Sequence, residues 1–173
     1  MEPRIKKNKN ALSYSEQQAF NQWWLFILLC GINVVFVVGC IKQLGFGISW
    51  GNNPMSNTVL IIYAVFFFFF SLWFLRMRLR TEIDSEGIQW KFFLLEFKAH
   101  FLSWDEIEDY EVSKYKPLSF GGWGIKSSQK TKVYSTSGNY ALKLKLKNGR
   151  YIYIGTQNPE ELKDVLNKIH VSG

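Results

Sequence analysis

Two long apolar runs set the first half of the chain apart from the second half. The first run is Trp23–Ile41, and the second is Thr58–Leu75, which contains five consecutive phenylalanines at positions 66–70. As a helix, the first run would be about 28 Å long, close to the hydrocarbon thickness of a bilayer. The pattern therefore predicts two transmembrane helices, over residues 23–41 and 58–75, joined by a connection over residues 42–57 that is rich in Gly, Asn and Ser.

A helix-start signal precedes the first run. Ser13 and Glu16 have the spacing of a capping box, which predicts a helix that begins at Ser13 and continues through Phe20 into the first span. This divides the chain into three parts: a basic, disordered N-terminus over residues 1–12, a juxtamembrane helix and transmembrane hairpin over residues 13–80, and a soluble domain over residues 81–173.

Beyond residue 81 apolar and polar residues alternate, as they do in half-buried β-strands. One predicted strand places Ile88, Trp90 and Phe92 on a shared face. The next places Phe97, Ala99 and Phe101 on one face and Lys98 and His100 on the other. A later strand turns three leucines inward and three lysines outward: Leu142, Leu144 and Leu146 against Lys143, Lys145 and Lys147. Asn148-Gly149 then predicts a type I′ hairpin turn.

The chain ends in a predicted helix. Asn158 is the expected N-cap and Pro159 the first helical residue. One apolar stripe follows at helical spacing: Leu162, Val165, Leu166 and Ile169.

About seven short strands followed by one amphipathic helix is the element order of a pleckstrin-homology-like (PH-like) barrel. The fold class is thus a membrane α-hairpin followed by a soluble, mostly β domain. The sequence resembles bacterial PH-like domain proteins that carry a paired-helix membrane anchor, through four segments: YSEQQAFNQWW, GGWGIK, VYSTSGNYALKLKLKNG and IGTQNPEEL. The resemblance implies this fold, a bacterial inner membrane and no particular activity, because such proteins are mostly without an assigned function.

Basic residues flank the two apolar runs on their outer sides. Six of the seven net positive charges lie within residues 1–80, where Lys and Arg precede the first run and follow the second. They are Arg4, Lys6, Lys7 and Lys9 before it, and Arg76, Arg78 and Arg80 after the other. The positive-inside rule then predicts that both termini are cytoplasmic and that the 42–57 connection lies outside. Charge in these positions is a topology signal and not a nucleic-acid footprint.

Four residues of the first span share a helical stripe: Cys30, Asn33, Val37 and Cys40. Two interpretations stay open, namely packing against the second span and contact between copies of the chain, in which a buried Asn would hydrogen-bond between helices. The cysteines stand too far apart on one helix for a disulfide.

The candidate catalytic motifs lack their required context. Gly47-Ile48-Ser49-Trp50-Gly51 matches a nucleophile elbow but lies between two spans rather than between a strand and a helix. The Gly121-Gly122-Trp123-Gly124 loop lacks the spacing of a phosphate loop, so its Trp123 either packs on the domain or anchors a partner. Neither His100 nor His170 has neighbours at metal-ligand spacing. We therefore predict no enzyme activity, cofactor or metal.

Charge is segregated along the soluble domain. Acids dominate residues 82–111, whereas residues 112–159 contain none. With the early strands in one sheet and the late strands in the other, this predicts a basic binding surface: Lys132, Lys143, Lys145, Lys147 and Arg150, with Trp123. The predicted function is a non-enzymatic, membrane-anchored binding or scaffold protein for protein–protein assembly with a partner or a second copy. The alternative is recognition of anionic lipid head groups by this basic sheet.

Overall fold

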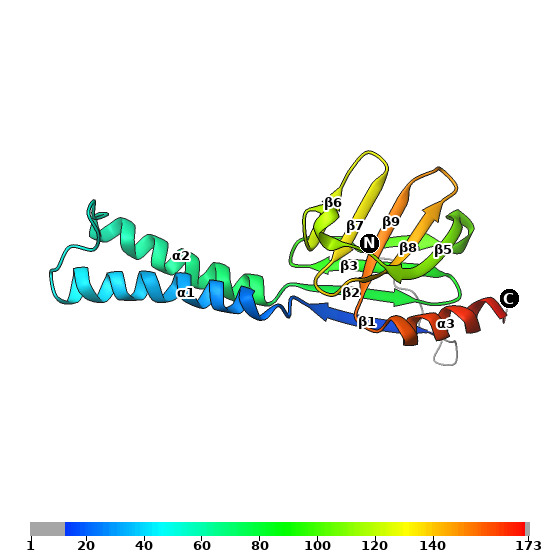
Figure 1. Ribbon diagram of the computed structural model, residues 1–173, viewed down its shortest axis with the longest axis horizontal. Helices are drawn as coiled ribbons and strands as arrows, with labels where there is room; N and C mark the ends of the chain where they lie inside the picture. Colours follow the sequence, from blue (N-terminus) through cyan, green and yellow to red (C-terminus); the bar gives the residue numbers. More distant parts are fainter. Residues whose placement is uncertain (1–12, 172–173) are drawn as a thin grey trace. The chain divides into compact units, whose positions relative to one another are not determined.

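The computed structural model describes residues 13–171, which form two compact units (Figure 1). One unit is residues 21–76. The other joins residues 13–20 to residues 77–171. The chain therefore leaves the second unit after Phe20 and returns to it at Met77. The predicted disorder of residues 1–12 lies outside the described residues.

The first unit is a helical hairpin. Helix α1 (Trp23–Cys40) continues into a π-helical segment, η1 (Ile41–Gly45), and helix α2 (Asn57–Leu75) follows. Both are long and apolar enough to cross a membrane, and only 11% of the residues in each apolar window are buried. The helix boundaries confirm the predicted helical segments over residues 23–41 and 58–75 to within a few residues.

A polar contact ties the two helices together. Asn33 Nδ2 donates to Ser71 Oγ at 2.8 Å, and Ser71 Oγ donates to the Phe67 carbonyl at 2.7 Å. One turn along α1, the rings of Phe36 and Phe67 stack with centroids 5.0 Å apart. Because the Asn33 amide finds its partner inside the hairpin, this contact stabilises the pairing of α1 with α2.

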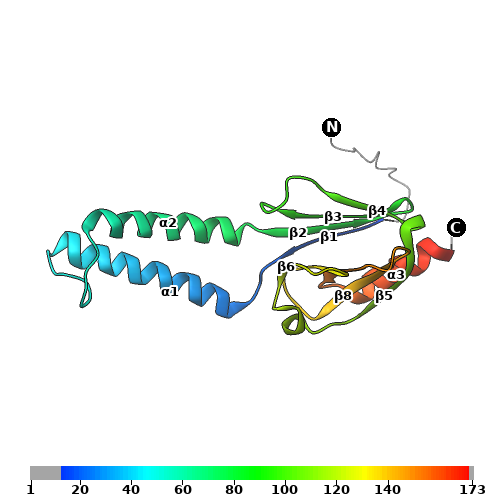
Figure 2. The same cartoon turned by 90° about the horizontal axis from the view of Figure 1, so that it is seen from above.

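The second unit contains two β-sheets, seen as two layers in Figure 2. The first has the order β1-β2-β3-β4 and the second the order β5-β8-β9-β7-β6. The strands of the first sheet are β1 (Tyr14–Ala19), β2 (Arg78–Ile83), β3 (Gly87–Phe93) and β4 (His100–Ser103). Those of the second are β5 (Ile107–Lys114), β6 (Gly124–Ser127), β7 (Thr131–Ser135), β8 (Tyr140–Leu146) and β9 (Tyr151–Thr156). Neighbours are antiparallel except β7 and β9, which are parallel.

Three short or terminal helices complete this unit: η2 (Trp104–Glu106), η3 (Pro117–Phe120) and α3 (Pro159–Val171). The core follows the alternation in the sequence. Ile88, Trp90 and Phe92 are at most 3% exposed, and the predicted inward leucines of β8 are buried as well. On the apolar stripe of α3, Leu162 and Leu166 are buried. The domain thus contains nine strands among the described residues, against about seven predicted.

The helix predicted from Ser13 to Phe20 is wrong, because this segment is strand β1. Tyr14, Glu16 and Gln18 are buried while Ser15 and Gln17 are exposed, so the segment has a period of two. The buried positions include polar side chains, so hydrophobicity did not reveal that period. Strand β1 pairs with β2 along its whole length, and a domain boundary at residue 80 would cut through β2.

The face assignment of the strand around His100 is also wrong. Strand β4 begins at His100, which pairs with Trp90, and Leu102 pairs with Ile88. Leu102 is therefore buried, whereas Phe97 is 98% exposed and Phe101 46% exposed. A shift of one residue in register moves every side chain to the opposite face, so His100 points inward.

The hairpin at Asn148-Gly149 is confirmed but its turn type differs. Gly149 has φ of +77°, whereas Asn148 is not among the residues with positive φ, so the turn is not type I′. The Gly149 amide donates to the Leu146 carbonyl at 2.9 Å and the Leu146 amide to the Arg150 carbonyl at 2.9 Å. This is a type I turn followed by a left-handed glycine, the three-residue hairpin loop.

Candidate functional site

A cleft with a volume of about 230 Å³ opens between the two sheets. One wall comes from β3, β4 and η2, and includes Trp90, His100 and Glu106. The other comes from β7, β9 and the turns before them, and includes Lys130, Lys132, Tyr134, Asn148 and Arg150. We call this set of residues the basic cleft.

Three permanent cations line the basic cleft: Lys130, Lys132 and Arg150. All three are exposed, and within residues 13–171 no ion pair joins a carboxylate to any of them. The acid of the cleft, Glu106, accepts a hydrogen bond from the Ser103 amide at 3.2 Å, as part of the capping box of η2. The cleft therefore has an excess of positive charge available to a ligand.

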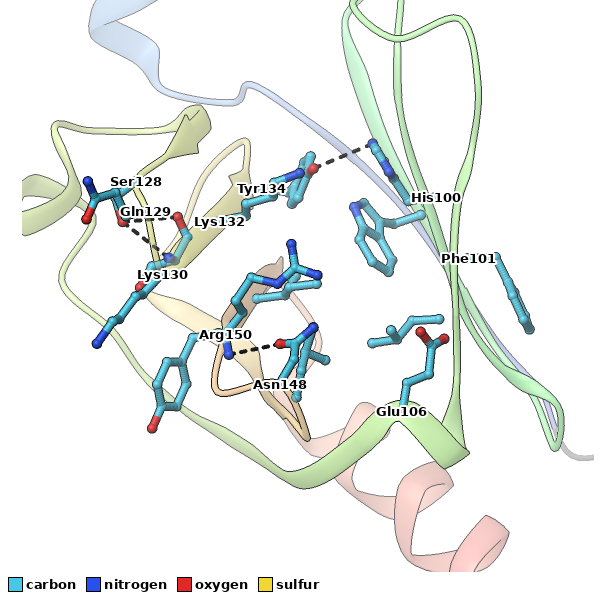
Figure 3. Close-up of a pocket in the computed structure, with 16 residues that line it drawn as sticks. His100, Phe101, Glu106, Ser128, Gln129, Lys130, Lys132, Tyr134, Asn148 and Arg150 are labelled. Carbon is cyan, nitrogen blue, oxygen red and sulfur yellow. Dashed lines mark hydrogen bonds between the residues drawn. The ribbon is translucent and has the colours of Figure 1, made fainter.

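Arg150 occupies the central position (Figure 3). Its side chain extends its guanidinium toward the wall that carries His100, whereas Lys130 extends away from the cleft centre. The Asn148 side chain accepts a hydrogen bond from the Arg150 amide at 3.1 Å, which fixes the turn. The Tyr151 amide donates to the Lys130 carbonyl at 2.8 Å and so joins the two cation-bearing turns. These bonds fix the backbone that carries Arg150, and its planar guanidinium is suited to bidentate binding of a carboxylate or phosphate.

Three aromatic rings bridge the sheets beside these cations. The ring centroids of Trp90, His100 and Tyr134 lie 5.3 to 5.6 Å from one another. His100 Nε2 lies 2.7 Å from Glu96 Oε1 and 3.5 Å from the Tyr134 hydroxyl. Burial raises the pKa of Tyr134, and the negative charge of Glu96 adds to this. Tyr134 therefore keeps its proton at neutral pH and can donate to a bound anion.

The predicted basic surface divides between the two faces of the second sheet. Lys132 pairs with Ile152 and so lies on the inner face, whereas Lys143 pairs with Tyr153 on the outer face. Only Lys132 and Arg150 of the predicted set line the cleft. Lys147 is exposed in the adjoining turn but does not line it. The parallel pairing of β7 with β9, which local patterns do not reveal, causes this division.

The expected separation of acidic and basic sheets is wrong. Strand β5 carries Glu108, Asp109 and Glu111 and belongs to the second sheet, next to β8. Asp109 pairs with Lys145, and Glu111 pairs with Lys143. Lys145 Nζ also lies 2.5 Å from Glu108 Oε1, and this contact raises the lysine pKa. Cross-strand neighbours of opposite sign thus neutralise the outer face.

Trp123 is half-buried and donates its indole N–H to the Gly138 carbonyl at 2.9 Å. Gly121, Gly122 and Gly124 all have positive φ, so the glycines of this loop allow a tight course. This geometry matches the packing interpretation of Trp123. The Gly47–Gly51 segment follows η1 and lies in a loop, without the strand and helix of a nucleophile elbow.

The four residues of the stripe predicted on the first span lie in different environments. Asn33 contacts α2 through Ser71, and Cys40 is half-buried. Cys30 and Val37 are exposed on the surface of the hairpin. Contact between copies through these residues stays a prediction.

Sequence reasoning missed much of the basic cleft. The alternation predicted His100 on the polar face of its strand, and no pattern indicated Lys130, Tyr134 or Glu106 as ligand-binding residues. A usable signal was present in Lys130, Lys132 and Arg150, because each adjoins the start of β7 or β9.

Among the described residues, no group of three metal-ligating side chains is present, and His170 has no described side chain. Neither a scan of protein families nor a search of curated proteins found a match to this chain.

Proposed function

We propose that this chain is a non-enzymatic, membrane-anchored binding protein whose PH-like domain binds an anionic group in the basic cleft. Two cations of the cleft, Lys132 and Arg150, carry the proposal, because they lie beside a buried tyrosine and a histidine and have no ion-pair partner among residues 13–171. Two apolar, largely unburied helices support the anchor, and two sheets followed by a helix support the PH-like domain. By the positive-inside rule, the domain faces the cytoplasm of a bacterial cell, at the inner membrane.

The anionic ligand is a phosphate or carboxylate group, from a lipid head group or from a soluble molecule. The shared chemistry is recognition by Arg150 and Lys132, with Tyr134 as a neutral donor. Assembly with a partner protein or a second copy, the function predicted first from the sequence, remains the second candidate. Its electrostatic basis is weaker, because acids of β5 lie opposite the lysines of β8.

Titration calorimetry of the full chain in zwitterionic nanodiscs tests this proposal, with glycerol phosphate as the probe. We expect Arg150→Glu to reduce the affinity by at least about tenfold, since charge-assisted hydrogen bonds contribute roughly 1.5–3 kcal/mol. The matched control is Lys147→Glu, which makes the same charge change in the same turn outside the cleft. No binding by the wild-type protein, or equal losses in both variants, would refute an anion site in the cleft.

Repeating the titration in phosphatidylglycerol nanodiscs distinguishes the sources of the ligand. If lipid head groups occupy the cleft, they compete and lower the apparent affinity for the probe. If the ligand is soluble, the affinity is unchanged once the salt concentration is matched.

A further inference from the structure

The last residue of β3 and the loop that follows it expose four large apolar side chains. They are Phe93 at 53%, Leu94 at 39%, Leu95 at 41% and Phe97 at 98% relative exposure. We call residues 93–97 the apolar loop. Contiguous exposed apolar groups of this kind mark a binding surface.

The apolar loop is held in place by its own hydrogen bonds. The amides of Leu95 and Glu96 both donate to the Phe92 carbonyl, at 3.2 and 2.9 Å. The Glu96 carboxylate accepts from the Phe92 amide at 3.0 Å and contacts His100 at 2.7 Å. Lys91 Nζ donates to the Phe97 carbonyl at 3.1 Å. These hydrogen bonds therefore fix the backbone of the loop in a conformation that leaves its apolar side chains exposed.

The backbone is strained at the same place. Leu94 has φ of +71° and is the one non-glycine residue with positive φ among residues 13–171. Residues with a Cβ rarely adopt this conformation, and such strain gathers at functional segments. The strained residue, Leu94, lies between two other exposed apolar residues, Phe93 and Leu95.

The covalent chain places this loop near the end of the second apolar helix. Arg78 is two residues after Arg76, so their Cα atoms are at most about 7 Å apart. Arg78 is the strand partner of Phe93, which adds about 5 Å. On the other side of β2, Ala19 pairs with the same Arg78, and the ring of Phe20 lies 6.1 Å from that of Phe92. Both chain connections to the helical hairpin therefore leave the domain next to the apolar loop.

We propose that the apolar loop inserts into the interfacial region of the bilayer, on the side where α1 begins and α2 ends. This inference rests on the proposed membrane anchor. Lipid is the proposed occupant because Phe93 is held within about 12 Å of the end of the span, a distance that allows the loop to reach the head-group region. The loop also combines aromatic and aliphatic residues with the exposed Lys98 and nearby arginines, the composition of interfacial anchors on anionic membranes. The loop gives the domain a third attachment, beside the two chain connections, and so limits its rotation on the membrane.

Site-specific fluorescence in reconstituted vesicles tests this inference. Cys30 and Cys40 are replaced by Ala, and a single cysteine carrying a nitrobenzoxadiazole label is placed by Phe97→Cys, Ser85→Cys or Val34→Cys. Ser85 is exposed in the turn at the opposite end of the β2–β3 pair, and Val34 is exposed on α1. We expect the Phe97→Cys and Val34→Cys labels to be quenched severalfold more by spin-labelled lipid than the Ser85→Cys label, which aqueous iodide quenches.

The other outcomes overturn the inference in distinguishable ways. Iodide quenching at Phe97→Cys with lipid quenching at Val34→Cys refutes the loop contact and leaves the anchor intact. Shielding of Phe97→Cys from both quenchers means that protein covers the loop. Lipid quenching at both Phe97→Cys and Ser85→Cys means that the loop is not the specific contact. Absence of lipid quenching at Val34→Cys refutes the anchor itself.

Discussion

Ala19 and Arg78 are direct partners in the β1–β2 ladder, although the whole helical unit, residues 21–76, lies between them in the sequence. The helical hairpin is therefore inserted into the turn of a β-hairpin. Strand β1 contributes buried side chains to the domain, so the helical hairpin interrupts the sequence of the domain without dividing its fold.

Replacing residues 21–76 by a short Gly- and Asn-containing turn should give a soluble domain that unfolds cooperatively. The turn has only to join the ends of two paired strands. A fragment of residues 81–173 should instead aggregate or lack fixed tertiary structure, because it loses β1 together with the buried Met77 and Leu79. Near-ultraviolet circular dichroism and urea unfolding check both. Equally cooperative unfolding of the short fragment would show that β1 is dispensable.

Glu16 is a buried carboxylate with three donors around it. The hydroxyls of Tyr14 and Thr156 donate to Oε2 at 2.6 and 2.9 Å, and the Gln157 amide donates to Oε1 at 2.8 Å. Glu16→Ala leaves these donors without their acceptor and should lower the free energy of unfolding of the joined domain by about 2–4 kcal/mol. Gln17→Ala, an exposed neighbour on the same strand, should change it by less than about 0.5 kcal/mol. Equal effects of the two substitutions would contradict a structural role for this network.

Alkaline pH should destabilise the domain through Tyr14. Burial, and then the hydrogen bond to Glu16, raise the pKa of Tyr14 above the range of a free phenol. The unfolded chain releases this proton near pH 10. The folded state therefore binds more protons above that pH, and the stability present below it is lost as pH rises. Tyr14→Phe should be less stable at neutral pH by about 1 kcal/mol and decline less steeply above pH 10. Parallel declines in urea-unfolding series would exclude Tyr14 as the titrating group.

The Asn33–Ser71 contact should stabilise the helical hairpin. A double-mutant cycle with Asn33→Leu and Ser71→Ala in detergent should give a coupling energy of about 0.5–1.5 kcal/mol. If Asn33 instead joins copies of the chain, Asn33→Leu should lower the oligomeric state on sizing and the coupling to Ser71 should vanish.

Hydrophobic periodicity and capping motifs correctly predicted the helices and strands that depend on residues close together in the sequence. The apolar runs predicted α1 and α2, the lysine–leucine alternation predicted β8, and Asn158-Pro159 predicted the start of α3. Strand β1 was not predicted, because its inward residues include the polar Glu16 and Gln18. Their burial depends on partners more than a hundred residues away in the sequence. The basic cleft was not predicted for two reasons. The β7–β9 pairing brings Lys132 and Arg150 opposite His100, and the register of β4 turns that histidine inward. Long-range pairing, rather than periodicity, determines the candidate site.

In the proposed arrangement, the hairpin anchors the two-sheet domain on the cytoplasmic side of a membrane. Single cysteines at Ser49→Cys, in the exposed connection between the helices, and Ser128→Cys, exposed at the rim of the basic cleft, test it directly in a background without Cys30 and Cys40. With a membrane-impermeant thiol reagent on intact cells, Ser49→Cys should be labelled, and Ser128→Cys should be labelled only after the membrane is permeabilised. Labelling of Ser128→Cys in intact cells, with Ser49→Cys protected, would reverse the topology, and protection of both sites until permeabilisation would contradict a membrane-spanning hairpin.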